Sequence, residues 1–207
     1  LARRRATNRE AMTLLGDALR EHGLEPAGPA VANFVFVRVD DAAAAGGALE
    51  LAGIDRLIAM HKTSFVQSLP LAYLNRIKGV DGVVEASSQD WFGGIYQEDR
   101  NQLPTFAVEA DTFFKVYSEY KLKPEEMDAF LKDRTSAIVG PMVAQRFGWK
   151  VGDRVGFQTQ TARKNGDTSW SFQIVGLFHN PEGMASGFLL ANYAFLDEAR
   201  AKARGTI

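Results

Sequence analysis

The sequence predicts an α+β fold, in which short helices accompany a mixed sheet and a small helix–strand–helix segment comes first. Two observations support this prediction. Short apolar or alternating runs, typical of strands, are separated by short helical patterns along the chain. Residues 135–179 also read, in order, as a strand, a short helix and a hairpin. A chain of 207 residues can hold one large domain or two small ones.

The first segment has the pattern of a helix, a strand and a second helix. Residues 5–23 are expected to be helical, because apolar residues recur at three- and four-residue spacing before Gly23. A strand is expected at 31–39 and an alanine-rich helix at 42–52, with Asp40 and Asp41 in the cap and first turn. A unit of about fifty residues is too small to bury a good core alone.

Six short elements are expected between residues 55 and 131. Strands are predicted at 55–60, 82–86 and 106–109, and helices at 70–77, 111–117 and 124–131. Asp111 is expected to be the N-cap of its helix. Pro124 suits a first helical turn, where its missing N–H leaves no bond unmade.

The central unit begins with a strand at 137–139, which Gly140-Pro141 stops. We expect the following helix to end at Gly148, a plausible C-cap, and Gly152-Asp153 to lie in a turn. Strands at 154–160 and 170–178 flank Asn165-Gly166, the strongest short hairpin signal in the chain. A last strand is predicted at 187–190 and a helix at 191–203. The central unit contains no obvious reactive group, which indicates a structural or coupling role.

Composition excludes several classes of function. The net charge of −1 offers no general electrostatic basis for binding nucleic acid, and we interpret the arginines at 3–5 as a solvated helix start. The absence of cysteine excludes disulfides, thiolate nucleophiles and cysteine-type metal sites. No apolar run approaches the ~18–20 residues that span a bilayer. The chain begins at Leu1 without a methionine, and we expect it to be a fragment.

The candidate chemical groups do not add up to a catalytic or metal site. His22, His61 and His179 show no H-x-x-x-H spacing, and a shared zinc site would still lack ligands. Asp90 is a candidate general base, but an acid beside an aromatic residue is more often a turn or cap residue. Gly93-Gly94 lacks the context of a phosphate-binding loop. We therefore expect no catalytic, cofactor-binding or metal-binding residues.

The aromatic residues after residue 90 lie close together in sequence, and core packing is the expected explanation. The alternative is an exposed aromatic face that binds a partner protein, because aromatic residues are enriched at interfaces. The glycines beside them are expected to provide backbone freedom. The structural or interaction candidates are Trp91, Phe92, Gly93, Gly94, Gly140, Gly148, Gly152 and Asp153.

Residues 3–54 contain the motifs TNREAMTLLGDALREHGLEP, ANFVFVRVD and LELAGI. This segment resembles the C-terminal small domain of fold-type I, pyridoxal-phosphate-dependent aminotransferases of the histidinol-phosphate type. In that family the Schiff-base lysine and the cofactor-phosphate residues belong to a large domain that has no counterpart in this chain. The resemblance implies an alternative function, in which the chain is a fragment of such an aminotransferase. That enzyme would be cytoplasmic and would depend on pyridoxal phosphate.

Residues 55–207 contain the motifs DRLIAMHKTSF, LPLAYLNRIKGVDGVVEASSQDWFGGIYQ, FAVEADTFFKVYSEYKL, DRTSAIVGPMVAQRFGWKVGDRVGF and FQIVGLF. Their order resembles the MacB-like periplasmic core domain of FtsX-family ABC-transporter permeases, and F-G-W-K-V-G-D-R-V is the most specific part. The family places this domain between two transmembrane helices, neither of which is in this chain. In that family the domain also continues beyond the position of residue 207, so we expect a truncated domain.

The permease resemblance implies a non-catalytic domain on the extracytoplasmic, periplasmic side of the inner membrane, which couples transmembrane motion to substrate or to a partner. The implied partners are the transporter ATPase subunit, which would bind the ATP, the transmembrane permease regions and a periplasmic protein. The transported substrate is not implied. The two resemblances meet near Ile54-Asp55, which predicts two segments, 1–54 and 55–207, and a fusion or chimera. A soluble interaction module is a third hypothesis.

Overall fold

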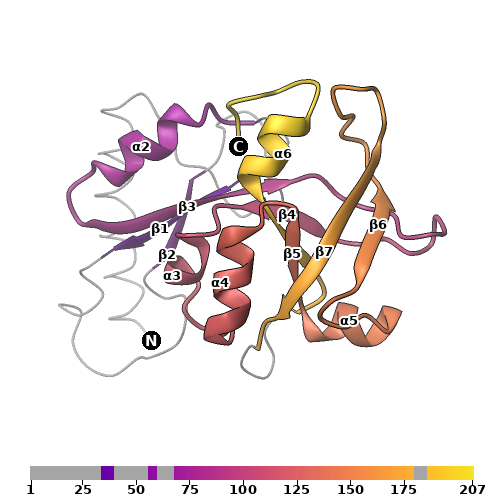
Figure 1. Ribbon diagram of the computed structural model, residues 1–207. Helices are drawn as coiled ribbons and strands as arrows, with labels where there is room; N and C mark the ends of the chain where they lie inside the picture. Colours follow the sequence, from indigo (N-terminus) through magenta and orange to yellow (C-terminus); the bar gives the residue numbers. More distant parts are fainter. Residues whose placement is uncertain (1–33, 40–55, 60–67, 180–185) are drawn as a thin grey trace.

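The computed structural model describes residues 34–39, 56–59, 68–179 and 186–207, with side chains for 68–179 and 186–207 (Figure 1). The described strands form one mixed sheet in the order β2-β1-β3-β4-β8-β5-β7-β6, which confirms the predicted α+β class. The strands are β1 (Phe34–Val39), β2 (Arg56–Ala59), β3 (Val83–Trp91), β4 (Thr105–Val108), β5 (Ser136–Val139), β6 (Arg154–Gln158), β7 (Ser169–Leu177) and β8 (Leu189–Asn192). The helices are α2 (Ala72–Lys78), α3 (Phe113–Val116), α4 (Pro124–Lys132), α5 (Pro141–Phe147) and α6 (Tyr193–Ala199).

Both kinds of strand pairing occur in the sheet. Strand β4 runs parallel to β8, and β5 runs parallel to β7, whereas the other neighbouring pairs are antiparallel. Strand β1 comes from the first predicted segment and pairs with β3 of the second, from Phe34 opposite Gln89 to Val39 opposite Val83. One strand of residues 1–54 therefore lies in the same sheet as residues 55–207. The division into two domains stays a prediction.

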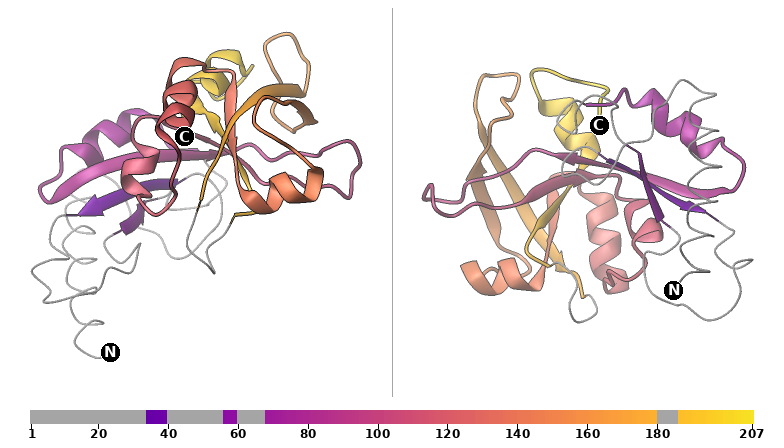
Figure 2. Two further views of the ribbon diagram at one scale, coloured as in Figure 1. Left: turned by 60° about the horizontal axis from the view of Figure 1, so that its bottom comes forward. Right: turned by 180° about the vertical axis from the view of Figure 1, so that it is seen from behind.

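Strand alternation distributes the apolar side chains over the two faces of the sheet. In β5, Ala137 and Val139 belong to a cluster with residues of α2, α5 and α6, while Ile138 belongs to a second cluster with α3 and α4. In the view of Figure 1, α2 and α6 lie above β3 and β4, and α3 and α4 lie below them. Figure 2 shows α5 from two sides at one end of strands β5, β6 and β7. The core is thus two clusters separated by the sheet.

The aromatic residues that are close in sequence are divided between these two clusters. Phe92 is buried in the first, where Trp170 lies 5.8 Å and Phe157 6.2 Å from it between ring centroids. Phe113 is buried in the second and stacks on Tyr117 at 4.8 Å. Core packing therefore accounts for these rings, as predicted, although the two rings lie on opposite faces of the sheet.

Most predicted elements are present, with three corrections to their ends. Strand β3 continues beyond the predicted residue 86 to Trp91, because residues 87–89 pair with β1 and residues 89–91 pair with β4. Helix α3 has Thr112 rather than Asp111 at its N-cap. Helix α6 ends at Ala199 rather than residue 203, since Arg200 is extended and Ala203 has a φ of 56°.

The predicted hairpin is present, because β6 and β7 pair antiparallel and Asn165-Gly166 lies in the turn that joins them, where Gly166 has a φ of 84° and its amide donates to the Arg163 carbonyl at 2.8 Å. Strand β6 ends at Gln158 and β7 at Leu177, each earlier than the sequence suggested, and the last strand is displaced by two residues. Strand β8 begins at Leu189 and ends at Asn192, whose side-chain oxygen accepts a bond from the Ala194 amide and so caps α6. The helices predicted at 5–23 and 42–52 lie outside the described residues, as do His22 and His61.

Candidate functional site

Helix α5 is bounded by two glycines that the sequence singled out. Gly140 is the N-cap, and a Cβ placed there would overlap the carbonyl oxygen of Ser186. Gly148 is the C-cap, with a left-handed φ of 71°, which confirms the predicted helix end. The first glycine permits a close approach of two chain segments, and the second permits a turn.

The turn between α5 and β6 is held by backbone bonds around Gly152 and Asp153. Gly152 has a φ of 100°, and its N–H donates to the Ile174 carbonyl at 2.8 Å. The Asp153 carboxylate accepts from the Lys150 amide at 2.8 Å, while its carbonyl accepts from the Ile174 amide at 2.8 Å. These contacts fix the start of β6 against β7, which is a structural task.

The glycine-rich stretch after β3 packs against the same unit. Gly93 has a φ of 57°, and a Cβ on Gly94 would lie 2.9 Å from Cδ2 of Phe157. The ring of Tyr96 lies 4.9 Å from that of Phe147 and 4.8 Å from that of Trp149. The structure therefore brings together two regions that the sequence marked separately, the segment after residue 91 and the segment 147–155.

Trp91 ends β3 and lies on the opposite face of the sheet from Phe92, the residue after it, because Trp91 packs on Phe106 beside the second cluster whereas Phe92 belongs to the first. It is 39% exposed and meets Phe106 edge-on at 5.0 Å. Phe106 in turn meets Phe188 at 5.9 Å. Trp91, Phe106 and Phe188 form an aromatic row of which Trp91 is the exposed member, so this residue keeps its status as an interaction candidate.

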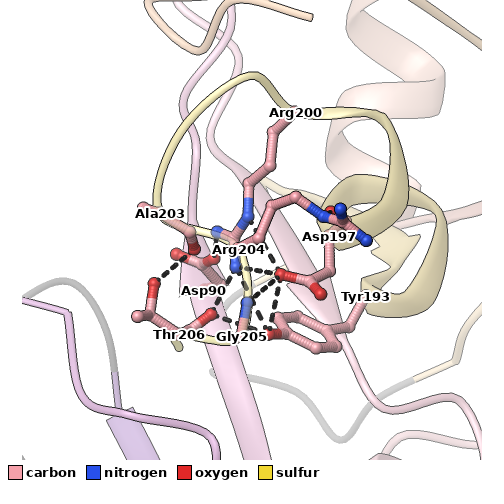
Figure 3. Close-up of polar contacts among 8 residues, drawn as sticks. All are labelled: Asp90, Tyr193, Asp197, Arg200, Ala203, Arg204, Gly205 and Thr206. Carbon is pink, nitrogen blue, oxygen red and sulfur yellow. Dashed lines mark hydrogen bonds and ion pairs between the residues drawn. The ribbon is translucent and has the colours of Figure 1, made fainter. Parts of the chain in front are cut away.

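A buried ionic cluster joins β3 to α6 (Figure 3). The Arg200 guanidinium donates to the Asp90 carboxylate at 2.7 Å, and each of the two residues is only 4% exposed. The same guanidinium donates to the Asp197 carboxylate at 2.5 Å. A buried charge without a partner would cost several kcal/mol, so the two carboxylates and the guanidinium depend on one another.

The cluster also holds the backbone near residue 206. The Thr206 carbonyl accepts bonds from the Arg200 guanidinium at 2.5 Å and from the Tyr193 hydroxyl at 2.7 Å. The Gly205 amide donates to the Asp197 carboxylate at 2.7 Å. Residues 205–206 are thus tied to α6 by side chains rather than by a sheet ladder.

Burial and the neighbouring charges shift the pKa values of the groups in the cluster. Burial raises the pKa of Asp90 to about 6, against the opposing effect of the Arg200 guanidinium. Burial also acts to raise the pKa of Asp197, but bonds from Arg200 and from the Gly205 amide outweigh it and hold this pKa below its usual range. Burial raises the pKa of the Tyr193 hydroxyl. One carboxyl of the cluster therefore titrates near neutrality, and the other does not.

Asp90 differs from the turn or cap residue that the sequence suggested. It lies inside β3, and its carboxyl faces Arg200 in the core. Arg200, Asp197 and Tyr193 were missed as a group. Tyr193 and Asp197 lie one turn apart on α6, and Arg200 follows as its C-cap, so their spacing is a detectable signal. Their partner Asp90 is 110 residues away in sequence, and no local pattern connects them.

Other chemical sites are few in the part of the chain that the structure describes. No group of three metal-ligating side chains occurs within the described ranges, and His179 there is exposed, with its backbone paired to Lys121. No helix among the described residues has the length and apolar character required to cross a membrane. A surface hollow of about 410 Å³ is lined by Arg163, Lys164, Asn165, Phe195, Glu198 and Ala199.

Comparison with known protein families gives no match, and no curated protein matches. Among solved structures, a permease domain from Porphyromonas gingivalis shares 16% identity at a TM-score of 0.36, over 53% of this chain and 49% of its own. The extracellular domain of the noncanonic ABC-type transporter YknZ from Gram-positive bacteria shares 15% identity at a TM-score of 0.44, over 83% of this chain and 80% of its own.

These two neighbours are domains of permease or ABC-type transporter proteins. This chain spans about half the length of the first of them. Neither of the two is an aminotransferase, so the resemblance of residues 3–54 to that family stays a prediction.

Proposed function

We propose that residues 55–207 form the extracytoplasmic domain of an ABC-transporter permease and have a coupling role without catalysis. The observation that carries the proposal is the sequence resemblance of this segment to the MacB-like core domain, above all in F-G-W-K-V-G-D-R-V. Residues 147–155 form the end of α5, its cap and the turn into β6. The residues of the resemblance therefore have structural tasks, as expected for a domain that transmits motion.

The geometry of the sheet supports a coupling role. The described strands form one continuous ladder from β2 to β6, with apolar clusters on both faces. Close-packed interiors of this kind deform little and transmit displacement. We therefore propose that a displacement applied near α2 is passed through the sheet toward α5.

Two segments far apart in sequence lie side by side at one point of the domain. Leu69 and Ile207 exchange backbone bonds at 2.6 Å and 2.8 Å, and the Leu71 amide donates to the Gly205 carbonyl at 2.8 Å. These bonds tie residues 69–71 directly to residues 205–207.

The proposal assigns the other parts of the transport cycle to other chains or regions. ATP would bind a separate ATPase subunit, and the membrane would be crossed by permease helices outside residues 55–207. A periplasmic protein is the proposed partner of Trp91, the exposed member of the aromatic row. The net charge of −1 offers no attraction for nucleic acid.

Cysteine labelling in intact cells tests the proposed location, because the chain has no cysteine of its own. We would introduce Met142→Cys into the full permease gene of the source organism, since Met142 is 60% exposed. A membrane-impermeant maleimide should label this variant before lysis. The matched control is Ala137→Cys, which is fully buried and should remain unlabelled in the native protein.

Labelling of Met142→Cys only after lysis would overturn the proposed location. The coupling role has a separate readout in the assembled transporter. Hydrogen exchange of residues 68–207 should differ between the nucleotide-free and the vanadate-trapped ATPase. Identical exchange in the two states would reject coupling while leaving the location intact.

A further inference from the structure

Residues 69–71 and 205–207 meet outside the ladder of the main sheet. Their contact consists of three backbone bonds between Leu69, Leu71, Gly205 and Ile207, plus an isolated bridge between Pro70 and Thr206. The last residues of the chain lie between α2 and α6 in Figure 1 and in the right view of Figure 2. We call this contact, residues 69–71 with residues 205–207, the latch.

The path into the latch is a tight and exposed turn. Residues 201–205 are exposed, Ala203 has a φ of 56° and Gly205 a φ of 69°. An alanine in the left-handed region costs about 1 kcal/mol relative to ordinary backbone. The turn therefore has little packing of its own. At its start the Ala201 amide donates to the Ala162 carbonyl at 2.9 Å, and at its end side chains hold Gly205 and Thr206.

Those side chains are the ionic cluster. The Thr206 carbonyl accepts from Arg200 and from Tyr193, and the Gly205 amide donates to Asp197. Arg200 is oriented by Asp90 of β3 at 2.7 Å, so the strand holds the latch through one guanidinium. The apolar anchors are the buried side chains of Leu69 and Ile207.

We propose that the Asp90–Arg200 cluster holds the latch closed and that the latch opens as a unit separate from the sheet. The closed state of the latch is more strongly favoured in weakly acidic than in neutral solution. Opening parts residues 205–207 from residues 69–71 and gives Asp90 access to water. The inference concerns this chain alone and does not rest on a transport role, so its failure and that of the proposed function are separable.

The direction of the pH effect follows from the groups that face Asp90. Arg200 donates to it, and Asp197 and Tyr193 lie around the same guanidinium. Burial raises the pKa of Asp90 to about 6 in the closed latch, against an ordinary 3.8 in water. A proton is therefore held more tightly when the latch is closed, and lowering the pH from 7 to 5 should favour closure by about tenfold.

Amide hydrogen exchange of the full chain, resolved by residue with NMR, tests the proposal. The Leu69, Leu71 and Ile207 amides report on the latch, and the Gly140 and Phe178 amides, which bond within the β5, β7 and β8 region, report on the sheet. After correction for intrinsic rates, protection of the latch amides should be about tenfold higher at pH 5 than at pH 7. Asp90→Asn should abolish that difference.

Two further variants separate a local latch from general stability. Tyr193→Phe removes the bond to the Thr206 carbonyl, together with the longer contacts of the same hydroxyl to Asp197 and Arg200 at 3.3 Å. It should lower protection of the latch amides by about fivefold, with the sheet amides unchanged. Arg134→Met removes an exposed ion pair with Glu198 of α6, the helix that contains Tyr193. This variant should change the protection of neither the latch amides nor the sheet amides. The proposal is overturned if latch and sheet amides change by one common factor, or if latch protection at pH 5 and pH 7 is equal.

Discussion

Asp90 shows how two environmental effects compete at a single carboxyl. Burial in the core disfavours its charge, the Arg200 guanidinium at 2.7 Å favours it, and burial wins, so that the pKa is raised to about 6. A carboxyl with a raised pKa in the folded protein stabilises it most below the unfolded pKa. That contribution is lost as the pH rises through the folded pKa. For Asp90 the loss falls between pH 3.8 and about 6.

Replacing this carboxyl should therefore change how stability depends on pH. We expect the free energy of unfolding of Asp90→Asn to rise relative to wild type between pH 4 and pH 7, by at most on the order of 3 kcal/mol. Urea unfolding at several pH values measures it. Glu109, whose pKa burial also raises, acts in the same direction in both proteins and cancels in the difference. If the difference in free energy of unfolding between Asp90→Asn and wild type did not depend on pH, the raised pKa of Asp90 would be contradicted.

Trp91 and Phe92 also show that the surroundings of a side chain, rather than its type, decide its role. The two aromatic residues are neighbours in sequence, yet one is 39% exposed on one face and the other is buried on the opposite face. Residue type therefore explains neither role. The strand geometry of β3 decides which ring belongs to the core and which is available to a partner.

At the scale of elements, the junction of β5 and α5 depends on how closely another segment approaches it. Gly140 caps α5 directly beneath the backbone of Ser186, and Pro141 begins the helix with a φ that suits its first turn. The approach leaves no room for a side chain, which explains the glycine better than any need for backbone freedom, since its φ is −74°.

A single methyl group tests this approach. Gly140→Ala should destabilise the protein by roughly 1–3 kcal/mol or more, because the methyl group must displace backbone atoms. The matched control is Gly156→Ala in β6, where the nearest atom to a new Cβ is the Trp170 carbonyl oxygen at 3.8 Å. That variant should cost less than about 0.5 kcal/mol. Equal destabilisation of the two variants in chemical unfolding would refute the close contact.

At the scale of the whole molecule, strand β1 joins the two predicted segments. It lies between β2 and β3 in the sheet, although residues 1–54 resemble a different family from residues 55–207. The pairing from Phe34 opposite Gln89 to Val39 opposite Val83 is therefore the contact to remove when the predicted division is tested.

Limited proteolysis tests the division. We expect cleavage to concentrate near residues 54–60 and the product 61–207 to stay folded, because the side chains that the structure describes in residues 68–179 and 186–207 already form two apolar clusters. The amides of β3 that face β1 should then exchange faster. Far-ultraviolet circular dichroism and hydrogen exchange measure both effects. Uniform resistance across the junction, or an unfolded product, would contradict two separate domains.

Local patterns were sufficient for the elements whose signals lie within a few residues. The helix predicted at 124–131 is α4 (Pro124–Lys132), with Pro124 at its start and Glu126 bonded back to the Lys123 amide. The left-handed cap at Gly148 was equally predictable, since a helix end of this kind needs a glycine. Element ends were harder, because β3 continues to Trp91 only where β4 lies beside it.

The sequence by itself determined the α+β class, most of the short elements and the absence of cysteine chemistry, because periodicity, turn residues and composition are local properties. Only the tertiary structure decided that Asp90 meets Arg200, that Trp91 is exposed while Phe92 is buried, and that residues 205–207 lie on residues 69–71. Each of these depends on strand pairing or on contacts across about one hundred residues. Pairing of that range is set by the burial of whole faces, which no short stretch of sequence encodes.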